Sequence, residues 1–136
     1  MDAAQALADL TEISSQIQAA VLLDDSGAVT ASTFSDEDRA ARVARAAQEL
    51  LAAAGRVRAG SGQTLTQLEA ATLGGSVFIA RDGGHTIAAT TTAEPTVGLV
   101  FYDLKSCLRA LAAEGDDDGK PRPIARKREA ASESAA

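Results

Sequence analysis

Side chains that could carry out chemistry are few in this chain and lie far apart. His85 is the only histidine among the 136 residues, and Cys107 is the only cysteine. The chain therefore has too few histidines for a histidine-based metal cluster and too few cysteines for a Cys-x-x-Cys metal or redox site. A Ser-His-Asp triad would need His85. We interpret His85 as an ordinary residue at a turn or strand edge, and Cys107 as a small hydrophobic residue of the core.

Other segments resemble functional motifs, but each lacks a part that its chemistry requires. Ser61, in Gly-Ser-Gly, lacks the G-x-S-x-G spacing of a nucleophile elbow, and the same segment lacks the last small residue of a dinucleotide fingerprint. The acidic run 116–118 has no glycine-turned loop for a cation, and the basic residues 126–128 are too few for stable membrane attachment. No G-x-x-x-x-G-K-[ST] motif occurs. We therefore expect no enzyme, no catalytic residue, no cofactor and no metal.

The composition favours one domain that binds proteins or small ligands. The apolar content of 46% suffices for one compact core, and the net charge of −6 argues against binding to nucleic acids or anionic membranes, which requires a positive field. The amino end has no basic segment followed by a long apolar run, so we expect no signal peptide. We expect a cytoplasmic protein without stable membrane insertion.

The composition changes after Ala113, which divides the chain into a domain of residues 1–113 and a charged tail of residues 114–136. Ile124 is the only large apolar residue of the tail. Burial of one such side chain cannot offset the entropy lost on ordering, so we expect the tail to be disordered.

Three helices are predicted from apolar residues that recur every three or four positions. The first covers residues 3–14 and the second residues 36–54, with Ser35 as its N-cap and Gly55 as its stop. The third follows Pro95. Gly98 within it costs about 1 kcal/mol relative to alanine, which we attribute to close packing against a sheet.

Five strands are predicted between these helices. Residues 17–23 and 28–33 form a hairpin around Asp-Asp-Ser-Gly, and residues 64–72, 76–81 and 86–92 form a meander with glycine turns. The order α-β-β-α-β-β-β-α predicts an α/β module with a five-stranded antiparallel sheet and helices on both faces.

The middle helix and the first meander strand are unusual for a monomer. Alanines flank the apolar face of the helix, which either reflects high helix propensity or provides a close-contact surface for a second subunit or a partner. Both faces of the strand mix polar and apolar residues, as suits an edge strand that can join a second chain.

The runs "VLLDDSGAVTAS", "TLTQLEAATLGGSVFIARDGG" and, above all, "HTIAATTTAEPTVGLVFYDLKSCLRAL" resemble the Roadblock dynein light-chain family, including its MglB-like and actinobacterial conservon branches. The resemblance covers nearly all of residues 1–113. It implies a profilin-like fold and a homodimer in which residues 36–54 and 66–72 meet their symmetry mates. It also implies that the partner is a small Ras-like GTPase in a bacterial signalling or polarity system.

Two sets of site residues follow from this resemblance and from the middle helix. We expect at the dimer interface Val43, Ala46, Ala47, Leu50, Ala53, Ala54, Thr66, Leu68 and Ala70. We expect as exposed GTPase contacts Arg39, Arg42, Arg45 and Gln48. The sequence leaves open a nucleotide-independent interaction scaffold and a small-ligand sensor. It also leaves open whether the protein would stimulate GTP hydrolysis, promote nucleotide exchange or only localise the GTPase.

Overall fold

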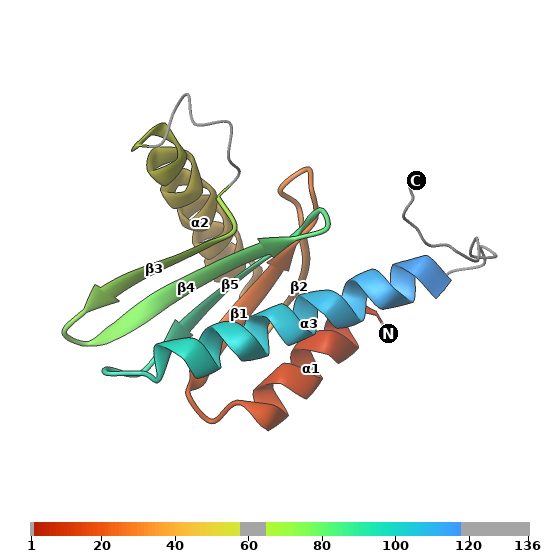
Figure 1. The fold of residues 1–136 in the computed structure, drawn as a ribbon, viewed down its shortest axis with the longest axis horizontal. Helices are drawn as coiled ribbons and strands as arrows, with labels where there is room; N and C mark the ends of the chain where they lie inside the picture. The colour runs from red at the N-terminus through yellow and green to blue at the C-terminus, as the bar shows by residue number, and fades with distance from the viewer. Residues whose placement is uncertain (1, 58–64, 118–136) are drawn as a thin grey trace, which may run out of the picture.

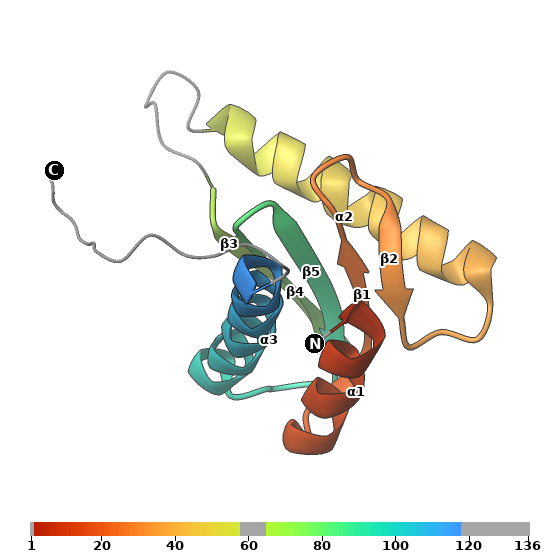
Figure 2. The same cartoon turned by 90° about the vertical axis from the view of Figure 1, so that its right-hand side faces the viewer.

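One five-stranded antiparallel sheet with helices on both faces forms the body of the protein, as predicted (Figure 1). The computed structural model describes residues 2–57 and 65–117. The elements are α1 (Ala3–Ile13), β1 (Ile17–Leu23), β2 (Val29–Ser32), α2 (Glu37–Val57), β3 (Gln67–Thr72), β4 (Gly75–Asp82), β5 (His85–Thr91) and α3 (Val97–Asp117). The strand order is β2-β1-β5-β4-β3, so β2 and β3 are the edges. α2 covers one face, and α1 and α3 lie side by side on the other (Figure 2).

Aspartates cap two of the helices. The Asp2 carboxylate accepts the backbone N–H of Gln5 at 2.8 Å at the start of α1. At the start of α2, Asp36 accepts the N–H of Asp38 at 2.9 Å through its side chain, and its carbonyl accepts the first helical hydrogen bond. Asp36 therefore occupies the N-cap position that we assigned to Ser35, because a cap side chain bonds the second or third N–H of the helix.

α2 extends further than its sequence predicts. Gly55 does not end it, since the helix continues to Val57 and Gly55 is not among the glycines with positive φ. A glycine stops a helix when the chain turns into the left-handed region there, and this chain does not turn at Gly55. The extension exposes 82% of the Val57 side chain.

The β1–β2 hairpin is organised by one carboxylate. The Asp24 Oδ1 atom accepts the N–H of Ser26 at 2.9 Å, the hydroxyl of Ser26 at 2.6 Å and the N–H of Ala28 at 3.0 Å. These hydrogen bonds, with that from the Ser26 hydroxyl first, lower the pKa of Asp24. Gly27 follows with φ of +90°, which suits glycine. The predicted hairpin is confirmed, with strand bounds that differ by one residue.

The sheet separates two hydrophobic cores. The larger core lies beneath α1 and α3, where Phe78 is fully buried and meets Phe101 edge to face at 5.0 Å between ring centroids. The smaller core lies beneath α2 and consists of Val21, Ala40, Ala47, Leu51, Ile79 and Ala88. Three of these six residues are alanines, so α2 approaches the sheet closely.

α3 differs from its sequence prediction in two ways. It runs to Asp117, beyond the domain boundary that we placed at Ala113; residues 118–136 of the predicted tail lie outside the described residues. Gly98 is exposed, and a Cβ atom added there would meet nothing within 4 Å. Close packing against the sheet therefore does not explain this glycine.

The replacement of Gly98 by alanine should stabilise the protein. Gly98→Ala removes backbone freedom from the unfolded chain and adds no clash, so the free energy of unfolding should rise by about 0.5–1 kcal/mol. Gly75→Ala is the contrasting control, because its Cβ would collide with the Thr91 carbonyl oxygen and should cost about 1–3 kcal/mol. Urea unfolding measures both; equal changes would contradict this assignment.

Candidate protein-interaction surface

α2 turns four small or medium side chains to the sheet and leaves an apolar strip beside them. Ala40, Ala44, Ala47 and Leu51 are buried. Beside them lies a strip of apolar residues that are partly or fully exposed, which we call the α2 flank. It consists of Val43, Ala46, Leu50, Ala53, Ala54 and Val57. Leu50 is 36% exposed. The apolar face of α2 is therefore wider than the part of it that the sheet of the same protomer buries.

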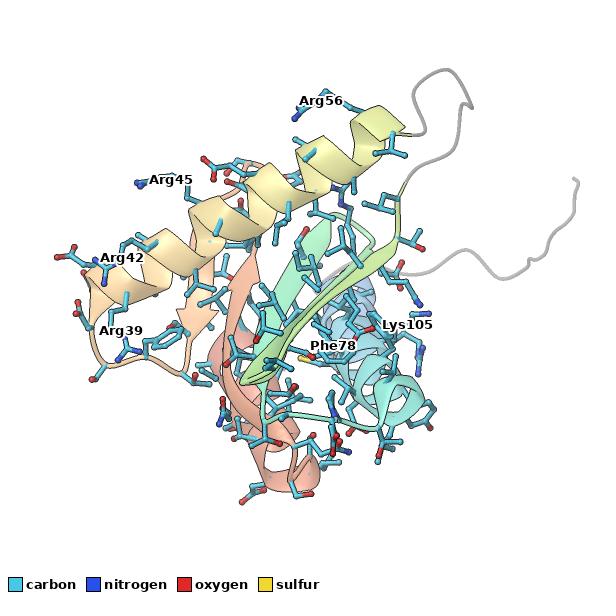
Figure 3. The ribbon with its side chains drawn as sticks, turned by 90° about the vertical axis from the view of Figure 1, so that its left-hand side faces the viewer. Arg39, Arg42, Arg45, Arg56, Phe78 and Lys105 are labelled. Carbon is cyan, nitrogen blue, oxygen red and sulfur yellow. The ribbon has the colours of Figure 1, made fainter. Side chains whose placement is uncertain are left out.

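The edge strand β3 presents its apolar residues to the same side of the sheet. Leu68 lies opposite Ile79 and Ala70 opposite Val77, so these four side chains share the face that α2 covers. Leu68 and Val77 are only partly buried and pack against the smaller core, as does Val43 of the α2 flank. α2 contacts β1, β2 and β5, whereas β3 and β4 form the part of the sheet beside it (Figure 3).

The residues predicted for a dimer interface therefore gather on one side of the protomer, with one exception. The α2 flank supplies Val43, Ala46, Leu50, Ala53 and Ala54, and β3 and the residue before it supply Leu68, Ala70 and Thr66. Ala47 is only 2% exposed and belongs to the protomer's own core. Val57 and Val77 lie on the same side and were not predicted; Val57 follows residue 54, where the predicted second helix ended.

The four residues predicted as GTPase contacts do not form one surface. Arg42 and Arg45 point away from the sheet into solvent (Figure 3). Arg39 lies over the Phe34 ring at 5.0 Å, a cation–π contact within the protomer. Gln48 packs against Gly27 of the β1–β2 turn. At about 100° per residue, Gln48 lies on the opposite side of α2 from Arg39.

Comparisons with known proteins agree with this architecture. The family model of the Roadblock/LC7 domain matches residues 4–92. The chain belongs to the Roadblock/LC7 family. The match ends before α3, so the helix whose sequence we weighted most for the resemblance lies outside it.

Solved structures share the fold of this Roadblock/LC7 chain over most of its length. A Roadblock/LC7 domain from Streptomyces avermitilis superimposes with a TM-score of 0.74 at 19% identity, over 85% of this chain and 99% of that one. A second such domain from that organism gives 0.62 at 22% identity, over 78% and 94%. MglB from Myxococcus xanthus gives 0.65 at 15% identity, over 88% of each chain. No curated protein matches by sequence.

The reactive side chains of this Roadblock/LC7 domain do not converge. His85 is the first residue of β5, partly buried, and Cys107 lies in the larger core with its Sγ atom 3.7 Å from the Ala6 carbonyl oxygen. Within residues 2–57 and 65–117, no group of three potential ligand side chains could hold a metal ion, and no helix is apolar and long enough to cross a membrane. Ser61 and residues 126–128 lie outside the described residues.

The Cys107 thiol should be nearly inert in the folded protein. Burial, followed by the nearby Asp9 carboxylate, raises the pKa of Cys107 to about 11, so the thiolate is scarce at neutral pH. Alkylation by iodoacetamide at pH 7.5 should be slower by roughly 100-fold or more than in the urea-unfolded chain, and it should accelerate with rising pH up to that pKa. Equal rates in folded and unfolded protein, followed by mass spectrometry, would contradict the core assignment.

Proposed function

We propose that this chain is a non-enzymatic, homodimeric regulator or adaptor of a small Ras-like GTPase in a bacterial signalling or polarity system. The observation that carries the proposal is the α2 flank beside the edge strand β3. Membership of the Roadblock/LC7 family and the fold shared with MglB support it. The sequence contains no phosphate-binding loop motif, so in this proposal the partner binds the nucleotide.

The α2 flank has the properties of a helix–helix contact. Its large members are Val43, Leu50 and Val57, and its small members between them are Ala46 and Ala53. Alternation of large and small side chains lets a second helix approach closely, and fully burying one valine or leucine contributes about 1.5–3 kcal/mol. In a two-fold symmetric dimer each such side chain would be buried twice, once from each subunit, because both subunits present the same surface.

The edge strand would extend the same interface. β3 pairs with β4 on one side, and its outer side has no strand partner within residues 2–57 and 65–117. An unpaired edge carries a row of free backbone donors and acceptors that a second β3 can satisfy. Helix packing and edge pairing together would join the two sheets and cover the sheet face that α2 leaves open.

Arg42 and Arg45 are the residues that we retain as GTPase contacts. Both are exposed on the outer side of α2, away from the sheet. In the proposed dimer, two α2 helices lie together, so the outer sides of both would form one arginine-bearing surface. Arginine suits such a contact because its planar group binds carboxylates through two hydrogen bonds.

A charge placed on the α2 flank should dissociate the dimer. Leu50→Asp puts a carboxylate at the centre of the proposed contact and should raise the dimer dissociation constant by roughly 100-fold or more. Ala41→Asp is the matched control, since Ala41 is exposed on the other flank of the same helix. Sedimentation measures the mass of each. A monomeric parent chain, or a Leu50→Asp variant that still dimerises, would overturn the interface.

Charge reversal on the outer side of α2 should weaken binding to the GTPase. The test uses the GTPase encoded nearest this gene, loaded with GDP or with a GTP analogue. Arg42→Glu with Arg45→Glu should lower its affinity by at least about tenfold. Lys105→Glu with Arg109→Glu is the control, because it makes the same charge change on α3, across the sheet.

The affinities for the GDP-loaded and the GTP-analogue-loaded GTPase distinguish a GTPase regulator from a nucleotide-independent scaffold. Binding to neither state would overturn the GTPase proposal, and equal affinity for both would favour a nucleotide-independent scaffold. Unchanged binding of the arginine variant would remove Arg42 and Arg45 from the contact surface.

A further inference from the structure

A groove runs between α1 and α3, on the sheet face opposite to the α2 flank. The two helices lie side by side and point in opposite directions (Figure 1). The groove has a volume of about 340 Å³, and its lining is mostly apolar. Its walls include Ile13 and Asp9 from α1, and Tyr102, Asp103 and Cys107 from α3. None of these residues has a part in the proposed dimer or in the proposed GTPase contact.

The apolar side chains at the groove are poorly covered by the protomer itself. Ile13 is 73% exposed and Tyr102 is 63% exposed. Both lie at one end of the groove, because Ile13 ends α1 and Tyr102 is in the second turn of α3. Two large exposed apolar side chains on one groove indicate a binding surface, in contrast to single ones scattered over a protein.

The groove also contains a carboxylate to which residues 2–57 and 65–117 donate no hydrogen bond. Asp103 is only 8% exposed, and none of the hydrogen bonds between described residues ends on its carboxylate. Asp9, on the opposite wall, accepts one hydrogen bond from Gln5 at 2.9 Å. Arg109, about two turns further along α3, donates to the Ser106 hydroxyl at 3.1 Å and not to Asp103. A buried carboxylate is costly without a cation or donors, so the groove fits a basic ligand with an apolar side chain.

We propose that the groove binds the chain's own basic segment, residues 120–128. Its sequence, Lys-Pro-Arg-Pro-Ile-Ala-Arg-Lys-Arg, holds five basic residues and no acidic residue. Arg122 and Arg126 flank Ile124, the one large apolar side chain of the tail. The segment therefore combines positive charge for Asp9 and Asp103 with an apolar group for the apolar lining of the groove.

The segment is attached at a suitable distance. It follows α3, which is one wall of the groove, and Asp103 precedes the end of α3 at Asp117 by fourteen positions, or about 21 Å at 1.5 Å per residue. Extended chain advances about 3.1 Å per residue where prolines favour the polyproline conformation. From a reversal at Gly119, the seven residues to Arg126 can span about 22 Å, which brings the Arg126 side chain to Asp103, and the five residues to Ile124 span about 15 Å, which ends beside Ala110 and Cys107 of the groove. Glycine, the residue at position 119, tolerates the backbone conformations that such a reversal needs.

NMR spectroscopy of the full-length chain tests this docking. Arg122→Gln with Arg126→Gln removes two positive charges from the segment and should shift the amide signals of Asp9, Ile13, Asp103 and Cys107. Ser132→Asp with Ser134→Asp makes the same change of net charge outside the segment and should leave the groove signals unchanged. The shifts caused by the arginine variant should be lost in an Asp103→Asn background, because the buried anion is then absent.

The outcomes separate the possible ligands. Shifts confined to the groove and independent of protein concentration support docking of the chain's own tail. Absent shifts, or equal shifts in the serine control, overturn it. Shifts that grow with protein concentration also overturn it, because the groove is then filled by the tail of a second copy. All these outcomes are independent of the α2 flank, so they leave the proposed dimer and its GTPase untouched.

Discussion

A sheet with two apolar faces needs cover on both, and the helices of residues 2–57 and 65–117 cover only one face completely. α1 and α3 together cover the face that carries Phe78, whereas α2 alone packs on the other face over β1, β2 and β5. The remainder, formed by Leu68, Ala70 and Val77, stays partly exposed beside the α2 flank. An isolated protomer therefore leaves one apolar surface incompletely buried, and our functional proposal follows from that surface.

The composition of α2 explains how one helix serves two surfaces. Ala40, Ala44 and Ala47 face the sheet and bring the helix close to it, while Leu51 fills the remaining space. Little apolar area is buried by three alanines, so the larger side chains of the helix, Leu50 and Val57, remain available beside the core. Ala40, Ala44 and Ala47 thus pack within the protomer, whereas Ala46 and Ala53 lie exposed on the α2 flank.

The sequence predicted the helices and strands better than it predicted what individual residues contact. Alternation in β1 and the helical spacing in α1 depend on neighbours in the chain, and both elements appear at nearly the expected bounds. Gly55 and Gly98 were misread because the role of a glycine depends on what lies around it, which one chain segment does not contain. The four predicted GTPase contacts do not form one surface for the same reason. Arg39 stacks on Phe34 and Gln48 packs on Gly27, and both of these partners lie outside α2.

The sequence by itself determined the order and type of the elements, the family resemblance and the shortage of reactive side chains, because these follow from local periodicity and residue counts. Only the tertiary structure decided which side chains are left exposed. Ala47 and Leu50 both lie on the predicted apolar face of one helix, yet the first is 2% exposed and the second 36%. Likewise, Asp9 and Asp103 are far apart in the sequence and form one groove because α1 and α3 pack together. Burial depends on distant segments, so local pattern cannot specify it.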